Sequence, residues 1–209
     1  MKKSTKIYAA LASAAAVGAL AVPMSVAAQD GKATTIAKAN LRALNNSGAS
    51  GQAELRLSAD HKTLTVLIQA RGLERGGDHI SHIHGLSDNG QAVDSTCPTT
   101  AQDSDGDGFV ELAEGAATYG PILIDFMNID PDQDGRVNFK TTVNLSGSEM
   151  ALPLQMRHIV VHGMSVGTVG AGTPGEVDGT AGFKTVLPVL CGEITPVGNN
   201  AIQFRKVGG

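Results

Sequence analysis

The sequence contains no tryptophan and few other aromatic residues, with two tyrosines and five phenylalanines among 209 residues. A folded core made from this chain must therefore be aliphatic. Cysteine is also scarce, since Cys97 and Cys191 are the only two. If the chain is exported to an oxidising compartment, we expect these two residues to form a disulfide.

The sequence has no excess of positive charge. It contains 16 basic and 20 acidic residues, and removing Lys2, Lys3 and Lys6 with the N-terminal segment described next leaves 13 basic residues against 20 acidic ones. Nucleic acid and anionic membranes are therefore not expected as partners. The sequence identifies no protein partner.

Apart from its N-terminus, the chain lacks long apolar runs. The first six residues include three lysines, residues 7–22 are apolar and rich in alanine, and small residues lead up to Ala28. This order predicts a secretory signal peptide over residues 1–28 and a single domain over residues 29–209. The run is short for a membrane span and no cysteine lies near the cut, so we expect a periplasmic or secreted protein without stable membrane insertion.

Short segments of alternating polar and apolar residues predict strands. The clearest are residues 53–58 and 63–70, which alternate on either side of a turn and predict a hairpin. Residues 33–44 fit a strand or a short helix, and residues 163–182 predict a long loop. The pattern as a whole predicts an all-β antiparallel sandwich or flattened barrel, with further strands at residues 119–126, 138–145, 158–162, 183–189, 190–195 and 201–206.

Three histidines fall within six residues at positions 79, 82 and 84. On a strand, His82 and His84 point to one face and His79 to the other. Two imidazoles on one face can reach a single metal ion, and a third must come from His158 or His162, which also share a face. Imidazole suits copper, zinc, iron or nickel, and the Irving–Williams order favours copper.

Residues 103–114 fit a twelve-residue calcium loop. Oxygen ligands recur at the required spacing, a glycine stands at position 6, and the loop is expected to sit between strands rather than between two helices. The expected ligands are Asp103, Asp105, Asp107, the backbone carbonyl of Phe109, Glu111 and Glu114. Residues 130–141 repeat only the first half of this pattern and end on Thr141, so a plain turn and a second calcium site both remain open.

Four segments, in order between Gly51 and Thr195, resemble Cu/Zn superoxide dismutases. Residues 72–84 resemble the family's G-L-x-x-G-x-H-G-F-H-V-H, and residues 157–162 resemble G-R-T-L-V-V-H-E. Residues 179–184 resemble G-N-A-G-S-R, and residues 191–194 resemble A-C-G-V-I. The resemblance implies a Greek-key β-barrel.

The same resemblance implies roles for individual residues. His82, His84 and His162 would bind copper, and His79 would be a structural histidine bonded to backbone near it. Lys184 stands where the family has the arginine that attracts superoxide, which would be the substrate. Cys97 and Cys191 would form the structural disulfide.

The chain departs from this family at the zinc site. The family's bridging histidine falls at Ile122, and no histidine lies between His84 and His158, so no zinc site is expected. His158 could be a fourth copper ligand or could lie outside the site. We therefore expect weak dismutase activity or none.

A second family also resembles parts of the chain. CHRD domains carry a similar H-I-H-G segment, here at residues 82–85, followed by an N-G-P strand similar to residues 120–124 and a closing G-E-I similar to residues 192–194. This resemblance implies a non-catalytic binding or structural module, which calcium and a disulfide would stabilise. The two families therefore predict different functions for one β-domain.

Overall fold

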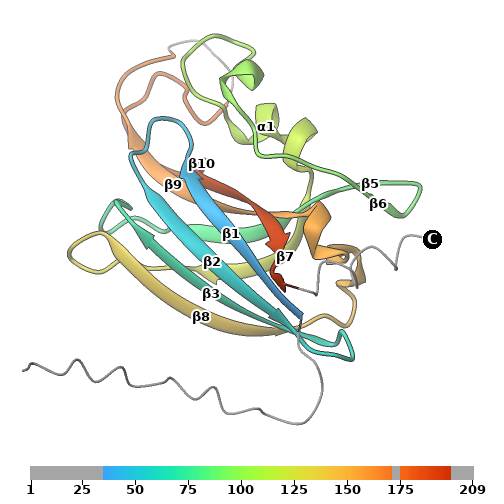
Figure 1. The fold of residues 1–209 in the computed structure, drawn as a ribbon. Helices are drawn as coiled ribbons and strands as arrows, with labels where there is room; N and C mark the ends of the chain where they lie inside the picture. Colours follow the sequence, from blue (N-terminus) through green and yellow to red (C-terminus); the bar gives the residue numbers. More distant parts are fainter. Residues whose placement is uncertain (1–34, 171–174, 199–209) are drawn as a thin grey trace, which may run out of the picture. The chain divides into compact units, whose positions relative to one another are not determined.

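The protein is a curled antiparallel sheet, shown in Figure 1, in a computed structural model that describes residues 35–170 and 175–198. The first half contains β1 Thr35–Ala43, β2 Ser50–Leu57, β3 Thr63–Arg71, β4 Ile80–His84, β5 Leu86–Asp88, β6 Gln91–Val93 and a 3-10 turn Thr100–Gln102. The second half contains α1 Leu112–Tyr119, β7 Ile122–Asn128, β8 Arg136–Asn144, 3-10 turns Glu149–Ala151 and Leu154–Met156, β9 His158–Val166 and β10 Gly182–Pro196.

Eight strands form one sheet in the order β7-β4-β9-β10-β1-β2-β3-β8, and every pairing is antiparallel. The sheet curls until it nearly closes into a barrel, and its two edge strands, β7 and β8, are consecutive in the chain. The chain crosses the barrel from β3 to β4 and again from β8 to β9, which is a Greek-key arrangement. The predicted fold class is therefore confirmed.

The interior of the barrel is aliphatic, as the scarcity of aromatic residues predicts. The period-2 pattern of β3 places Leu64, Val66 and Ile68 in the core while Thr63, Gln69 and Arg71 remain exposed. Among the described residues, Phe126 is the one fully buried aromatic side chain of the main core. The 53–58/63–70 hairpin is confirmed as the β2–β3 pair.

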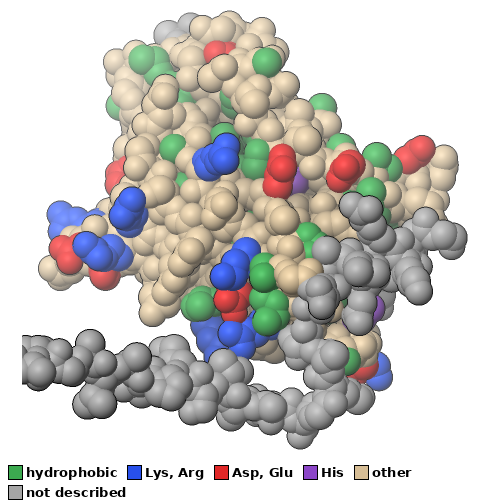
Figure 2. Space-filling view, in the orientation of Figure 1, with side chains coloured by type: hydrophobic (Ala, Val, Ile, Leu, Met, Phe, Trp, Pro, Cys, Tyr) green, Lys and Arg blue, Asp and Glu red, His purple; other side chains and the backbone are tan. Residues whose placement is uncertain are grey.

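The outward positions of the sheet carry charges of both signs. Figure 2 shows basic and acidic side chains interspersed on one face of the molecule. On β2, the Nη2 atom of Arg56 lies 2.6 Å from Oε1 of Glu54. A pair this exposed contributes little to the free energy of unfolding.

The structure settles one open choice and corrects several predicted boundaries. Residues 33–44 contain a strand, β1, which settles the choice between strand and helix. The expected strand at 119–126 begins only at Ile122, because Tyr119 ends a helix. The expected loop at 163–182 is shorter, since β9 runs to Val166, and the two strands expected at 183–189 and 190–195 are the single strand β10, interrupted by an irregularity around Pro188.

The predicted disulfide joins Cys97 to Cys191, with the two Cα atoms 5.8 Å apart. Cys191 is buried on β10, and both cysteines pack in a small apolar cluster with Val160 and Tyr119. A buried disulfide is typical of proteins that mature in an oxidising compartment.

The N-terminal and C-terminal predictions cannot be compared with the fold. The signal peptide at 1–28 and the strand expected at 201–206 lie outside the described residues. Within residues 35–170 and 175–198, no helix has both the length and the apolar character that crossing a membrane requires.

Candidate metal centre

The histidines lie on the outer face of two neighbouring strands. β4 pairs with β9 so that His82 is opposite Val160 and His84 is opposite His158. Alternation sends Ser81 and Ile83 of β4 to the other face of the sheet. The imidazoles of β4 and β9 therefore share one side of the sheet without any loop being needed to bring them together.

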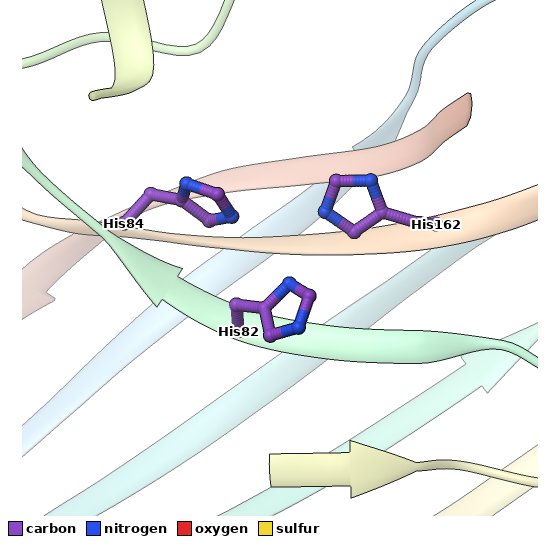
Figure 3. Close-up of side chains that lie close together, drawn as sticks. All are labelled: His82, His84 and His162. Carbon is purple, nitrogen blue, oxygen red and sulfur yellow. The ribbon is translucent and has the colours of Figure 1, made fainter. Parts of the chain in front are cut away.

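Three of these imidazoles converge. His82, His84 and His162, which we call the histidine centre, each place one ring nitrogen within 4.8 Å of the others. The ring centroids lie 5.4 Å apart for His82–His84, 5.2 Å for His82–His162 and 5.8 Å for His84–His162. Figure 3 shows the rings turned toward a common space between β4 and β9.

Backbone carbonyls fix how two of the rings present their nitrogens. Nδ1 of His84 lies 2.9 Å from the carbonyl oxygen of Gly120, and Nδ1 of His162 lies 2.7 Å from that of Val186. A carbonyl can only accept, so each Nδ1 must carry the proton and donate it. The lone pair of each ring is then on Nε2, which is the nitrogen a metal would bind.

The remaining nitrogens of the centre are buried without partners. Nδ1 of His82, Nε2 of His84 and Nε2 of His162 have no hydrogen bond among the described atoms. Buried polar atoms are normally satisfied. Three such atoms, one from each converging ring, form a donor set that fits a metal ion.

Burial keeps these rings neutral. Desolvation lowers the pKa of His84 to about 4 and that of His162 to about 3, and it also lowers the pKa of His82. Neutral imidazole is the form that binds metals. At neutral pH the centre therefore needs to lose no proton before it binds an ion.

The position of Gly120 explains how the acceptor for His84 reaches the centre. Gly120 is the C-cap residue that follows α1, with a φ of 76°. A β-carbon at this position would collide with the backbone of Gly85. Only glycine allows this close approach. The turn after α1 therefore lies directly against the end of β4.

His79 lies outside the converging group and contacts backbone. Its Nδ1 is 3.0 Å from the carbonyl oxygen of His162, and its Nε2 is 2.8 Å from that of Glu74. The Glu74 carboxylate in turn accepts hydrogen bonds from the backbone N–H and hydroxyl of Ser165. These contacts tie the segment before β4 to His162 and Ser165 of β9.

His158 does not join the histidine centre. Its Nδ1 lies 3.3 Å from the hydroxyl oxygen of Ser95, and its ring lies beside Tyr119 with centroids 6.4 Å apart. Desolvation lowers its pKa to about 4. Of the two roles left open by the sequence, the structure places His158 beside the centre rather than within it.

Lys184 is paired with an acidic side chain. Its ammonium donates to Asp178 at 2.9 Å and to the hydroxyl of Thr180 at 3.0 Å.

Ile122 stands where the dismutase family has its bridging histidine. It is the first residue of β7, and its side chain is half exposed. Neither Lys184 nor Ile122 belongs to a group that could hold a metal within the described chain.

The carboxylates among the predicted calcium ligands come together in two overlapping groups. Asp103, Asp105 and Glu114 form one group, and Asp105, Asp107 and Glu111 form the other. Within residues 103–114, which we call the acidic loop, the Asp103 carboxylate accepts the backbone N–H groups of Gly106 and Gly108 at 2.8 and 3.0 Å. These bonds curl the loop so that its carboxylates face one another.

The acidic loop leads into a helix, whereas from the sequence we expected the loop to lie between strands. α1 begins at Leu112, and Glu111 and Glu114 form a capping box at its start. The sequence signal was the Glu-x-x-Glu spacing followed by alanines, which the glycine at 115 obscured. The upstream flank contains only the 3-10 turn, so the loop is not enclosed by a helix pair.

Two carboxylates connect the acidic loop to the segment before β10. Glu111 is buried and accepts the backbone N–H of Val177 at 2.5 Å, and Glu176 accepts that of Leu112 at 3.1 Å. Desolvation, with repulsion from neighbouring carboxylates, raises the pKa of Asp107 and of Glu111. The loop is therefore electrostatically strained in the absence of a cation.

The second acidic segment, 130–141, begins with a turn and continues into β8 from Arg136. Asp132 accepts the backbone N–H groups of Asp134 and Arg136, both at 2.9 Å. Between residues 35 and 170, the clusters that could hold a cation do not include this segment. The turn interpretation explains the contacts that are present.

Two functional contacts were missed by the sequence. Asp125 of β7 lies 3.6 Å from Nε2 of His82, and its alternation with Ile124 and Phe126 could have placed it on the histidine face.

The second contact is made by Arg157, which is buried. It donates to the carbonyl oxygens of Leu86, Val93 and Met150 and so holds β5 and β6 against β9. No alternation predicts a buried arginine.

No protein-family model matches the chain, and no curated protein sequence matches it at significant similarity. The nearly closed antiparallel barrel is compatible with the resemblance to dismutases and with other β-barrel classes. Function must therefore be argued from side-chain geometry.

Proposed function

We propose that this is an exported, periplasmic or secreted protein that binds copper at the histidine centre. The observation that carries the proposal is the convergence of three buried ring nitrogens, one each from His82, His84 and His162, that have no hydrogen-bond partner in the described part of the chain. Three neutral imidazoles suit copper, and the Irving–Williams order favours it over zinc or nickel. The disulfide supports an oxidising location.

The proposed class is superoxide dismutase-like, with weak activity or none. In support, the three converging histidines are those that the resemblance assigns to copper, and they lie on two antiparallel strands of a Greek-key barrel. Bound copper would supply one-electron chemistry by alternating between two oxidation states. The chain itself would hold the ion and exclude water, since all three residues are at most 4% exposed.

Two features favour low activity. Ile122 supplies no imidazole at the bridging position, so the centre has no histidine there to deliver a proton. Lys184 is engaged by Asp178 and Thr180, which reduces the charge available to attract an anion such as superoxide. These features also favour the alternative, a non-catalytic CHRD-like binding or structural module.

The acidic loop is proposed to hold a structural calcium ion. Hard carboxylate oxygens at this spacing suit Ca²⁺. Burial, and after it repulsion from neighbouring carboxylates, raises the pKa values of Asp107 and Glu111, and a bound cation would offset both effects. Through Glu111 and Val177, the loop would then be braced against the segment that leads into β10.

A copper titration followed by a superoxide-consumption assay tests the proposal. We expect one copper ion per chain for the native protein and loss of that site in His162→Ala. A matched control is His61→Asn, because His61 is an exposed histidine in a turn with a φ of 57°, which asparagine tolerates. Equal copper binding by His162→Ala and native protein would refute the site, and copper binding without superoxide consumption would identify a carrier.

A further inference from the structure

β7 contains an irregularity directly beside the histidine centre. Ile80 of β4 pairs with Asn128, but His82 pairs with Asp125, so β7 has one residue more than β4 between these two pairs. An extra residue in one strand is a β-bulge, and bulges next to functional sites re-aim side chains. This bulge lies opposite the first ligand of the centre.

Met127 marks the strained point of the bulge. Its φ is 68°, a left-handed conformation that usually requires glycine, and its side chain is 70% exposed. An unbranched side chain held in this conformation stores strain without burying apolar surface. The conformation is therefore not explained by packing of the methionine side chain.

The bulge does have a consequence for Asp125. The backbone N–H of Met127 donates to Oδ1 of Asp125 at 2.7 Å, which fixes the carboxylate. The same Oδ1 lies 3.6 Å from Nε2 of His82. If Nε2 were unprotonated, two lone pairs would face each other across this contact, whereas a proton on Nε2 makes the contact attractive.

Each of the three histidines thus has an oxygen facing one of its ring nitrogens. Gly120 and Val186 offer carbonyl oxygens within hydrogen-bond distance of Nδ1 of His84 and His162, whereas a carboxylate oxygen of Asp125 faces the opposite nitrogen, Nε2, of His82 at 3.6 Å, beyond hydrogen-bond distance. Of the two ring nitrogens of His82, Nδ1 is the one that is buried without a hydrogen-bond partner among the described atoms. Acceptors on the far nitrogen of a metal-binding histidine set its tautomer and orientation.

We propose that Asp125, aimed by the Met127 bulge, is a positioning residue that keeps the proton of His82 on Nε2 and so presents Nδ1 to the metal. The metal part of this assignment rests on the proposed copper site. The tautomer part concerns the chain alone and can be measured without any ion.

Long-range proton–nitrogen NMR correlations on the metal-free protein decide the tautomer part. We expect His82 in the native protein to show the Nε2–H pattern alone. Asp125→Ala should add a measurable Nδ1–H population, whereas Asp125→Asn, which keeps an oxygen acceptor for both Met127 and His82, should preserve the native pattern. Asp88→Ala is the control, because it removes an exposed carboxylate from β5.

Copper affinity provides the second readout. We expect Asp125→Ala to lose about tenfold in copper affinity, the lower end for such acceptors because Asp125 is more than half exposed, and Asp125→Asn to lose less. A native His82 with its proton on Nδ1, or an Asp125→Ala protein with the native nitrogen pattern, overturns the assignment. Native protein that fails to bind copper overturns the proposed function instead, whatever the tautomer.

Discussion

The histidine centre and the acidic loop are built in opposite ways. The centre takes neutral ligands from two strands, His82 and His84 from one and His162 from the other, and buries them almost completely. The acidic loop takes charged ligands from twelve consecutive residues, most of them solvent-accessible. The first site is organised by the sheet before any ion arrives, while the second is held together by local backbone turns and strained by repulsion.

Removing the disulfide should have the largest effect on the free energy of unfolding. It should also weaken the calcium response of the acidic loop without changing copper binding at the histidine centre. The bond links residues 94 apart, and removing such a link costs about 5 kcal/mol of unfolding free energy in the chain-entropy model. Cys97 lies just before the acidic loop, so in Cys97→Ala/Cys191→Ala we expect a smaller calcium-induced rise in Tm and an unchanged copper stoichiometry. Urea unfolding and metal titration would show this, and loss of copper with an intact calcium response would contradict it.

Two single substitutions should uncouple the sites. His84→Ala removes one of three copper ligands and should weaken copper binding more than 100-fold, about 3 kcal/mol, while the calcium-induced rise in Tm persists. Glu114→Gln should abolish that rise and leave copper binding intact, because Glu114 belongs only to the acidic group.

Thermal melts of each variant with each ion provide the comparison. An undiminished calcium response in Glu114→Gln would remove the calcium assignment, and loss of both responses in one variant would mean that the sites are not separate.

Lowering the pH should make the histidine centre less stable and the acidic loop more stable. Between pH 6.5 and about 4, unfolded chains protonate histidines that the fold keeps neutral, so stability falls as pH falls. For His84, whose pKa drops from 6.5 to about 4, the loss approaches about 3 kcal/mol. The raised pKa values of Asp107 and Glu111 act in reverse, since the folded loop gains protons first.

Urea unfolding of the metal-free protein at pH 7.5 and pH 4.5 measures the net effect. We expect lower stability at pH 4.5 and a smaller loss in His84→Gln. Equal losses in the two proteins would show that burial of this histidine does not govern the pH response.

The smallest expected change in unfolding free energy comes from the inner face of β4, opposite the face that carries His82 and His84. Ser81 is fully buried on the inner face, and its hydroxyl has no hydrogen-bond partner among the described atoms. Ser81→Ala should therefore raise the unfolding free energy by up to about 1 kcal/mol and leave copper binding unchanged. A loss of stability in denaturant unfolding would indicate that the hydroxyl is satisfied, for example by a buried water.

The same contrast explains what the sequence could predict. Period-2 alternation was sufficient for the β2–β3 hairpin, for the aliphatic core and for the shared face of His82 and His84. The acidic loop was visible because all its ligands are adjacent in sequence. Such local patterns need no knowledge of strand pairing.

Features that depend on pairing were not predictable. Alternation alone left His158 and His162 open as the third ligand, and only the resemblance to dismutases implied His162. The contact of Asp125 with His82 required a bulge that no residue preference announces. The helix α1 was concealed by Gly115, although a capping box begins it. Alternation locates a face, and register decides which residues on that face meet.

The most direct test of the central claim is a crystal structure of the copper-loaded protein with anomalous data collected at the copper edge. We predict a single strong peak bound by Nδ1 of His82, Nε2 of His84 and Nε2 of His162. A peak elsewhere, or the absence of any peak at the histidine centre after loading, would contradict the account.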